Sequence, residues 1–371
     1  MSQINVSSLH SLDTKYSADS IEFCPFKNYF QFLACGTYQL SESKSNLTTN
    51  ENINSADEEK INHEPIKRLG KLLLYQIVNK ENSLKLQEVQ RIETAAILDM
   101  KWSHRMIDDK FVLALADASG KICLYGLNQD NVNNTQFNQL STCVTNEEKL
   151  CLSLDWSNRL ESSNNASIVV SQSDGNIVVV SIDNHIGILE KNRWHAHDFE
   201  AWIAAFNYWN TNLIYSGGDD NCFKGWDLRI NTSTSLFTNR RHQAGVCSIQ
   251  SNPNSEYYLS TGSYDEHIFL WDTRLMNEPV CEHFVAGGVW RLKWHPTRKD
   301  ILLSACMHNG FHVIKVNENN GKDSLSMNKL TSFMEHQSLA YGADWSYYHE
   351  SLVASCSFYD HTIHIWEANL N

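Results

Sequence analysis

The sequence has no apolar run as long as a membrane span and no signal-like stretch near its start. The first residues, MSQINVSSLHSLDTKYSAD, are interrupted throughout by polar side chains. A membrane helix needs about 20 consecutive apolar residues, and a secretory signal needs an apolar core of about 7–15. We therefore expect a cytoplasmic protein without a membrane span.

No two of the ten cysteines form a Cys-x-x-Cys pair. Most of them lie in apolar, strand-like runs, such as FLAC ending at Cys35 and ICL around Cys123. Paired spacing is typical of structural zinc sites and redox motifs, and the 16 histidines are mostly spaced singly. The pattern predicts buried, reduced thiols, no metal site and no cofactor.

Basic residues are also scarce relative to acidic ones. The chain has 30 Lys and Arg against 43 Asp and Glu, which gives a formal net charge of −13. Binding of nucleic acid depends on neutralising backbone phosphates with Lys and Arg. This balance argues against direct nucleic-acid binding and favours cationic partners.

The usual catalytic motifs are missing as well. The sequence contains no nucleophile elbow GxSxG, no phosphate-binding GxxxxGK and no HExxH. By themselves these absences favour a non-catalytic interaction platform over a common hydrolase or nucleotide-binding enzyme.

What the sequence does contain is an internal repeat. SGGDDNCFKGWDLR, ending at Arg229, recurs as TGSYDEHIFLWDTR, ending at Arg274, and SCSFYDHTIHIWEA repeats the pattern near the C-terminus. Trp226 and Trp271 are about 45 residues apart, which is the period of a four-stranded propeller blade. This pattern is the signature of the WD40 repeat.

Each strong repeat carries four polar or aromatic residues in a fixed order. A His precedes the first strand, a Ser or Thr lies in the second, an Asp in the tight turn and a Trp in the third. Because these groups can hydrogen-bond across a blade, we expect a structural role for them rather than a catalytic one. The sets are His197, Ser216, Asp220, Trp226; His242, Thr261, Asp265, Trp271; and His336, Ser355, Asp360, Trp366.

Three strong and four weaker repeats predict one all-β domain, a seven-bladed WD40 β-propeller over residues 1–371. We expect residues 4–12 to close the last blade, residues 41–68 to form a disordered insertion in blade one, and the closed ring to be a monomer. The blades are expected near 19–78, 95–127, 150–183, 194–229, 240–274, 282–316 and 334–368.

Reactive side chains gather at the predicted blade starts and turns, which WD40 geometry directs to one face and the channel mouth. Glu200, Asp219 and His308 are the candidate catalytic residues, although a structural role is an equal alternative for each. Packing between blades is the alternative for the tryptophans. The candidate substrate-binding residues are Tyr264, Trp290, Arg291, Tyr341 and Asp344.

Several strings together closely resemble one WD40 family, the diphthine methyl ester hydrolases (homologues of diphthine methyltransferase) of the diphthamide pathway. They are HDFEAWIAAFNYW, YSGGDDNCFKGWDLR, HQAGVCSIQS, TGSYDEHIFLWDTR, GGVWRLKWHP, ACMHNGF and HQSLAYGADW. The resemblance covers Trp194 to Trp366 in detail and the N-terminal blades by pattern. It implies an esterase that removes a methyl ester from the modified histidine of its partner, translation elongation factor 2.

The implied substrate suits the residues expected at the mouth. Diphthine carries a quaternary trimethylammonium group, and such cations bind to the faces of Trp and Tyr rings with added attraction from nearby carboxylates. Ester hydrolysis further needs an activated nucleophile and donors for the developing oxyanion. Water activated by Glu200, Asp219 or His308 is the expected route.

Two details of that route remain open. Arg291 or a backbone amide of the Gly287–Gly288 turn would stabilise the oxyanion, and Cys306 is an alternative nucleophile, less favoured than a buried inert thiol. Two other functions share the same face. One is a non-catalytic adaptor for a protein partner, and the other is a reader of trimethylated lysine.

Overall fold

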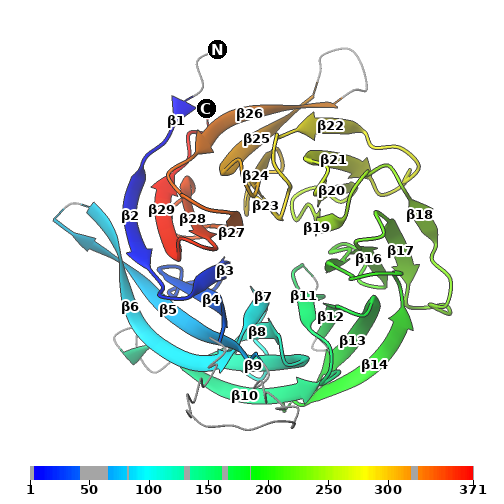
Figure 1. The fold of residues 1–371 in the computed structure, drawn as a ribbon, viewed down its shortest axis with the longest axis horizontal. Helices are drawn as coiled ribbons and strands as arrows, with labels where there is room; N and C mark the ends of the chain where they lie inside the picture. Colours follow the sequence, from blue (N-terminus) through cyan, green and yellow to red (C-terminus); the bar gives the residue numbers. More distant parts are fainter. Residues whose placement is uncertain are drawn as a thin grey trace, which may run out of the picture.

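The computed structural model describes residues 4–41, 66–81, 83–128, 134–160, 166–183, 185–318 and 325–370. Across these residues the regular secondary structure consists of β-strands, with no α-helix and thus no helix able to span a membrane. The strands form seven sheets arranged as a ring around one axis (Figure 1). The prediction of an all-β, seven-bladed WD40 propeller is confirmed.

The first five blades are each continuous in sequence. Blade one contains β3 (Ser17–Phe23), β4 (Phe32–Leu40), β5 (Arg68–Lys80) and β6 (Ser83–Ala95). Blade two contains β7 (Ile97–Trp102), β8 (Phe111–Asp117), β9 (Lys121–Leu127) and β10 (Phe137–Val144). Blade three contains β11 (Cys151–Trp156), β12 (Ser167–Gln172), β13 (Asn176–Ile182) and β14 (Ile188–His195). Blade four contains β15 (Ile203–Phe206), β16 (Leu213–Gly217), β17 (Phe223–Asp227) and β18 (Phe237–Asn239).

Blade five is also continuous, whereas blades six and seven each take a strand from the start of the chain. Blade five contains β19 (Val246–Ser251), β20 (Tyr258–Ser263), β21 (His267–Asp272) and β22 (Cys281–Phe284). Blade six contains β23 (Arg291–Trp294), β24 (Ile301–Ala305), β25 (Phe311–Glu318) and β26 (Leu325–Phe333), with β1 (Ile4–Asn5) at its edge. Blade seven contains β27 (Ala340–Trp345), β28 (Leu352–Ser357) and β29 (Thr362–Glu367), with β2 (Ser8–Asp13) as its outer strand.

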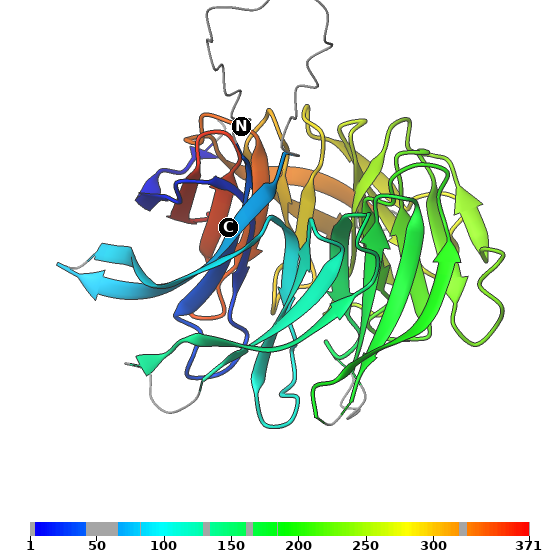
Figure 2. The same ribbon diagram turned by 60° about the horizontal axis from the view of Figure 1, so that its bottom comes forward.

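The segment expected to close the ring divides between two blades. β2 pairs antiparallel with β29, whereas Ile4–Asn5 pairs parallel with β26 of blade six. Figures 1 and 2 show the N-terminal strands beside the C-terminal blade. The expected blade-one insertion, 41–68, lies outside the described residues between 42 and 65, and β5 begins at Arg68.

Blades one to six also extend past the third strand at which their predicted ranges stopped. The fourth strands, such as β10 and β14, consist mostly of partly buried and exposed residues. They therefore lack the continuous burial of the inner strands β8 and β11. An edge strand with one solvated face gives only this weaker signal in a sequence.

Tryptophans at the ends of inner strands join neighbouring blades. Trp102, Trp156, Trp294 and Trp345 are buried, and burying such a side chain contributes roughly 1.5–3 kcal/mol. Each indole N–H also donates a hydrogen bond to a backbone carbonyl of the preceding inner strand. Trp156 Nε1, for example, donates to Lys101 O at 2.8 Å, and Trp345 Nε1 donates to Lys293 O at 3.0 Å.

The polar sets of the strong repeats lie inside their blades. In blade five, His242 lies 2.9 Å from Asp265 and 2.8 Å from Thr261, and Trp271 Nε1 donates to Thr261 Oγ1 at 2.8 Å. Blade four has the same arrangement. Blade seven differs because His336 Nδ1 lies 3.0 Å from Thr362 Oγ1 but 3.9 Å from Asp360.

Candidate functional site

In five of the seven blades, the innermost strand begins with a shift in its pairing that changes which side chains face the axis. In β3, β7, β11 and β19 the pairing with the next strand shifts by one residue, leaving Asp19, Leu98, Leu152 and Cys247 unpaired. Such β-bulges redirect a side chain and bend the strand. The bulged residue lies four positions before the last residue of each of these strands.

The same position in the other three blades is occupied by aromatic residues. Trp202 and Trp290 immediately precede β15 and β23, and Tyr341 lies at the pairing shift of β27. We call these seven equivalent residues the mouth ring. In blade order they are Asp19, Leu98, Leu152, Trp202, Cys247, Trp290 and Tyr341.

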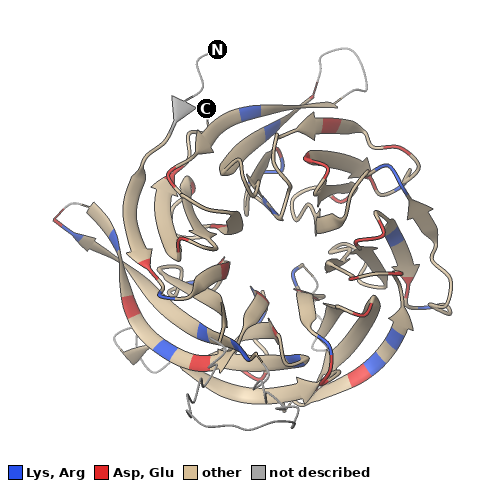
Figure 3. Cartoon of the chain, viewed as in Figure 1, with Lys and Arg blue, Asp and Glu red and all other residues tan. Residues whose placement is uncertain are grey.

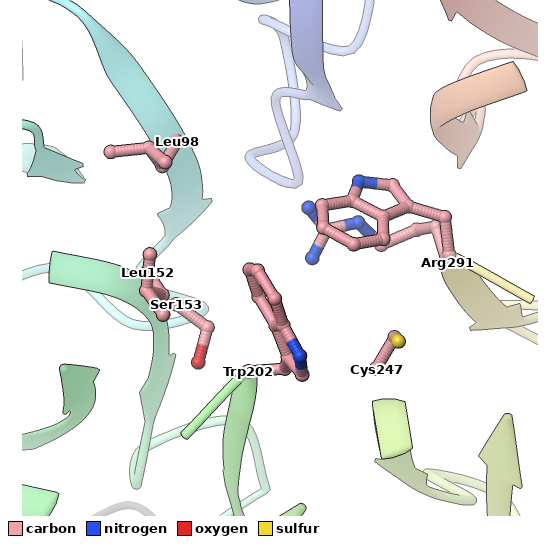
Figure 4. A pocket seen from close by; sticks show the side chains of 7 residues that line it. Leu98, Leu152, Ser153, Trp202, Cys247 and Arg291 are labelled. Atoms are coloured by element: carbon pink, nitrogen blue, oxygen red, sulfur yellow. The ribbon is translucent and has the colours of Figure 1, made fainter. Parts of the chain in front are cut away.

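Five of the seven mouth-ring residues line one pocket, which leaves about 30 Å³ of free space. Figure 4 shows Leu98 and Leu152 on one side of this pocket, and Cys247 and Arg291 on the other, with Trp202 between them. This space is large enough for a water molecule and is smaller than the roughly 300–1,000 Å³ that small-ligand sites occupy. Its lining residues are Leu98, Leu152, Ser153, Trp202, Cys247, Trp290 and Arg291.

Aromatic rings from different blades meet at this mouth. The ring centroids of Trp202 and Trp290 are 5.8 Å apart, and Tyr264 lies 6.3 Å from Trp202 and 6.1 Å from Trp290. Trp290 stacks on Tyr341 at 4.8 Å, and Tyr341 contacts Phe358 at 4.9 Å. We call these five residues the aromatic cluster. Spacings of 4.5–7 Å with offset or tilted planes are favourable for aromatic pairs.

The structure brings together Tyr264, Trp290 and Tyr341, which the sequence singled out as substrate-binding residues. Trp202 and Phe358 belong to the same cluster but were not singled out. Trp202 would have been found by aligning the ends of the inner strands, because it stands in blade four where Trp290 stands in blade six. Phe358 follows β28 and has no such repeat signal.

Asp219 is the candidate catalytic residue that contacts this cluster. It is exposed, and its Oδ1 accepts a hydrogen bond from Trp202 Nε1 at 3.0 Å. Its backbone N–H donates to the carbonyl of Glu200 at 2.9 Å, so Glu200 lies beside it. An exposed carboxylate therefore stands at the edge of the aromatic faces.

His308 is exposed in the turn between β24 and β25. Among the described residues, no hydrogen bond or ring contact joins the side chains of His308 or Glu200 to the aromatic cluster. The three candidate bases therefore differ in their surroundings. The Asp219 side chain contacts Trp202, whereas the side chains of Glu200 and His308 have no such contact among the described residues.

Arg291 lies inside the pocket and is buried. Its Nη1 lies 3.2 Å from Asp99 Oδ1, but the two groups are not aligned for a hydrogen bond. Asp99 Oδ2 accepts hydrogen bonds from Lys101 Nζ at 2.5 Å and from Leu154 N at 3.0 Å. Within the described residues, the guanidinium therefore has N–H groups without an aligned acceptor.

Asp344 lies away from the pocket lining. It is buried, its Oδ2 accepts a hydrogen bond from Phe23 N at 2.8 Å, and its Oδ1 lies 3.6 Å from Lys293 Nζ. Lys293 also pairs with Glu22. Figure 3 shows both signs of charge on the innermost strands. In this position Asp344 joins blade seven to blade one.

Cys306 has the surroundings of an inert thiol. It is fully buried, and its Sγ donates to Ser304 Oγ at 3.3 Å. Burial raises the pKa of this thiol to about 12, and the thiolate is the nucleophilic form. Neutral pH therefore leaves Cys306 protonated. In the described part of the chain, no group of three or more His, Cys, Asp or Glu is placed to hold a metal ion.

Comparison with known proteins identifies both the repeat and close relatives. A family model described as "WD domain, G-beta repeat" matches residues 233–272 and 327–367. The chain is 42% identical to "Diphthine methyltransferase" of Mus musculus over 93% of this chain and 70% of that protein. The Homo sapiens protein of the same name is 43% identical over 91% of this chain and 74% of its own length.

A more distant relative and a solved structure extend this picture. "Diphthine methyltransferase homolog" of Dictyostelium discoideum is 33% identical over 95% of this chain and 96% of that protein. A chain in the crystal structure of a mitotic checkpoint complex superposes with a TM-score of 0.69, covering 99% of this chain and 94% of that one. Its sequence identity is 15%, so this likeness concerns the fold alone.

Proposed function

We propose, because the chain belongs to the diphthine methyltransferase family, that it is the carboxylic ester hydrolase that removes the methyl ester of diphthine on translation elongation factor 2. In this role it would act in diphthamide biosynthesis in the cytoplasm. The name of these relatives denotes a methyltransferase, whereas the proposed reaction removes the methyl group as methanol. A change in substrate mass separates the two reactions.

The observation that carries the proposal is the aromatic cluster with an exposed carboxylate at its edge. Trp202, Trp290 and Tyr341 bring aromatic rings together beside the pocket, and Asp219 adds a negative charge beside Trp202. A trimethylammonium group is attracted to such faces by about 0.5–2 kcal/mol per ring contact. Diphthine carries this group near its ester.

The pocket also offers what ester hydrolysis requires. The N–H groups of Arg291 that lack an aligned acceptor suit an oxygen that gains negative charge in the transition state. The water that attacks the ester would be activated by Glu200, Asp219 or His308. Of these, Asp219 has the strongest support because it already contacts the cluster through Trp202.

The test is mass spectrometry of methylated-diphthine elongation factor 2 incubated with the purified protein. The expected result is loss of one methylene from the substrate and release of methanol. Gain of a methyl group from an added donor would instead support a methyltransferase. Single replacements at Glu200, Asp219 and His308 then rank the candidate bases, and full turnover by all three folded variants would exclude them.

A non-catalytic adaptor is the second candidate function. Phe199 and Tyr359 are 60% and 69% exposed, and Tyr359 contacts Phe358 of the aromatic cluster at 5.0 Å. Exposed aromatic side chains of this kind are common in protein interfaces. Binding of elongation factor 2 without any change in its mass would favour the adaptor.

A further inference from the structure

A second cavity lies between blades one and two and shares no lining residue with the mouth pocket. It has about 210 Å³ of free space. An apolar cavity of roughly 150 Å³ is large enough to hold benzene, so this space can hold a small ring. We call it the blade-two cavity. The lining residues used below are Glu93, Ile97, Leu115, Asp117, Cys123 and Tyr125.

The strand register shows which residues of blade five are equivalent to those of this cavity. In blade two, Leu115 on β8 pairs with Cys123 on β9. In blade five, Thr261 on β20 pairs with Phe269 on β21. Both pairs lie two residues after the partner of the last inner-strand residue. Leucine and cysteine therefore stand in blade two where blade five has threonine and phenylalanine.

A histidine ring fills this place in blade five. His242, four residues before β19, stacks on Phe269 with ring centroids 4.2 Å apart, and its Nε2 lies 2.8 Å from Thr261 Oγ1. The residue four positions before β7 is Glu93. Its side chain is 72% exposed, and its Oε1 lies 3.6 Å from Lys71 Nζ. The glutamate therefore does not replace the ring, and free space remains beside it.

Two other blades fill the equivalent place with different side chains. In blade three, Gln172 pairs with the first residue of β11 as Asp117 pairs with the first residue of β7. Arg193 from β14 reaches across and donates to Gln172 Oε1 at 2.7 Å. In blade six, the register places the ring of His312 where Cys123 stands. The side chains of blade two, and not the propeller fold, therefore account for its open cavity.

The inner wall of the blade-two cavity is apolar. Ile97 begins the inner strand, Leu115 lies on β8 and Tyr125 lies on β9. All three side chains are buried and line the cavity. A flat ring placed here would be removed from water on one face.

One buried carboxylate interrupts this apolar wall. Asp117 is 6% exposed, and its Oδ1 accepts hydrogen bonds from Ser119 N and Oγ at 2.8 Å and from Lys121 N at 3.0 Å. Its Oδ2 lies 3.9 Å from Cys123 Sγ and makes no other hydrogen bond among the described residues. Both of these residues line the cavity. A carboxylate oxygen has two acceptor sites, so Oδ2 can accept an N–H from a ligand.

We propose that the blade-two cavity binds a small molecule that carries a flat nitrogen heterocycle of the imidazole class. The ring packs against Leu115 and Tyr125, and one ring N–H donates to Asp117 Oδ2. A separate molecule then makes the kinds of contact that the His242 ring makes in blade five, where its Nδ1 lies 2.9 Å from Asp265. The site goes beyond the proposed esterase activity and does not depend on it.

Imidazole is the probe, and the methyl NMR signal of Ile97 is the readout. We expect a saturable shift with a Kd on the order of 1 mM, because a ligand of so few atoms has little surface to bury. The signal of Ile268 in blade five, which does not line the cavity, should stay unchanged. Furan has the same ring size but no N–H. It should bind at least about tenfold more weakly, because it cannot donate to the carboxylate.

Two variants test the apolar and the polar part of the site separately. Cys123→Phe introduces the residue type of blade five, and its ring should fill the cavity, abolish the imidazole response and raise Tm. Asp117→Asn replaces the free acceptor with an amide and should weaken imidazole binding about tenfold. Asp174→Asn is the matched control, because Asp174 accepts from Asn176 N in a turn of blade three and does not line the cavity. Its Kd should equal that of the wild type.

The outcomes that would overturn the inference are distinct. Absence of a saturable Ile97 shift in the wild-type protein would do so, as would unchanged binding by folded Cys123→Phe. If that variant does not fold, an unchanged Kd in Asp117→Asn decides against the site. Furan binding as tight as imidazole binding would reject the ligand class. Tighter binding of the peptide Gly-His-Gly would assign the cavity to a partner's side chain and reject a small molecule.

Discussion

Trp290 and Tyr264 hold the aromatic cluster together through different contacts. Trp290 has stacked and edge contacts within the aromatic cluster, and its Nε1 is buried without a hydrogen-bond partner among the described residues. Tyr264 closes the cluster next to Gly288, where a Cβ would come within 3.2 Å of the Tyr264 ring. The glycine therefore permits the close approach of this ring.

Trp290→Leu should weaken binding of the cationic substrate. The change removes one aromatic ring of the cluster but keeps an apolar side chain, so the expected loss is about 1–2 kcal/mol. Isothermal titration with a peptide carrying a trimethylammonium side chain measures it. Trp209→Leu is the control, since Trp209 lies outside the cluster and donates to Asn252 O. Equal losses in both variants would contradict a specific cation site.

Sequence reasoning found part of this site. Tyr264, Trp290, Tyr341, Arg291 and Asp219 were recognised because they stand at blade starts and turns with unusual side chains. Asp19 was missed because its place in the mouth ring depends on the pairing shift at the start of β3, and Trp202 was missed because the ends of the inner strands were not aligned with one another. A pairing shift of one residue leaves no mark in the hydrophobic pattern of a strand whose residues are all buried.

At the scale of single strands and blades, the polar sets hold each blade together. Thr261 on β20 accepts a hydrogen bond from Trp271 on β21 and bonds to His242 before β19. One hydroxyl thus connects three segments of blade five. The side chains involved are buried, so the bonds are shielded from water.

Thr261→Val should lower the free energy of unfolding by about 1–3 kcal/mol. Valine has nearly the same shape but leaves the Trp271 N–H and a ring nitrogen of His242 without a partner. Urea unfolding followed by tryptophan fluorescence measures this loss. Thr238→Val on the exposed edge strand β18 should change stability by no more than about 0.5 kcal/mol. A loss in Thr261→Val as small as in the control would show that the set contributes little.

For the whole molecule, closure depends on strands from opposite ends of the chain. His364 on β29 contacts β2 through a 2.8 Å hydrogen bond between its Nδ1 and Ser8 Oγ. Leu12 of β2 packs against the buried core of blades one and seven. The N-terminal strand therefore completes a sheet that would otherwise present an open edge.

Deleting residues 1–13 should destabilise the ring and promote self-association. The exposed edge of β29 would pair with other chains, because unpaired edge strands are templates for association. Size-exclusion chromatography and thermal unfolding measure both effects. Deletion of residues 1–3 removes neither β1 nor β2 and serves as the control. A monomeric 14–371 protein with an unchanged Tm would show that β2 is dispensable.

The closure should also weaken in acid. Burial lowers the pKa of His364 to about 4, and the neighbouring His336 adds to the shift. The unfolded state, with an imidazole pKa of about 6.5, then binds more protons, so stability is lost as pH falls from about 6.5 towards 4. Urea midpoints across this range should fall less steeply for His364→Gln than for the wild type. Parallel slopes would contradict this contribution.

The sequence by itself determined the fold class, because the repeat period, the His, Ser or Thr, Asp and Trp sets and the apolar inner strands are local properties of each blade. Only the tertiary structure decided which side chains share the pocket. Trp202 and Trp290 meet, and the Arg291 charge acts on the Asp19 carboxyl, because ring closure brings together strands far apart in the chain. Whether a buried carboxylate such as Asp19 has a partner depends on those neighbours, and no local pattern records them.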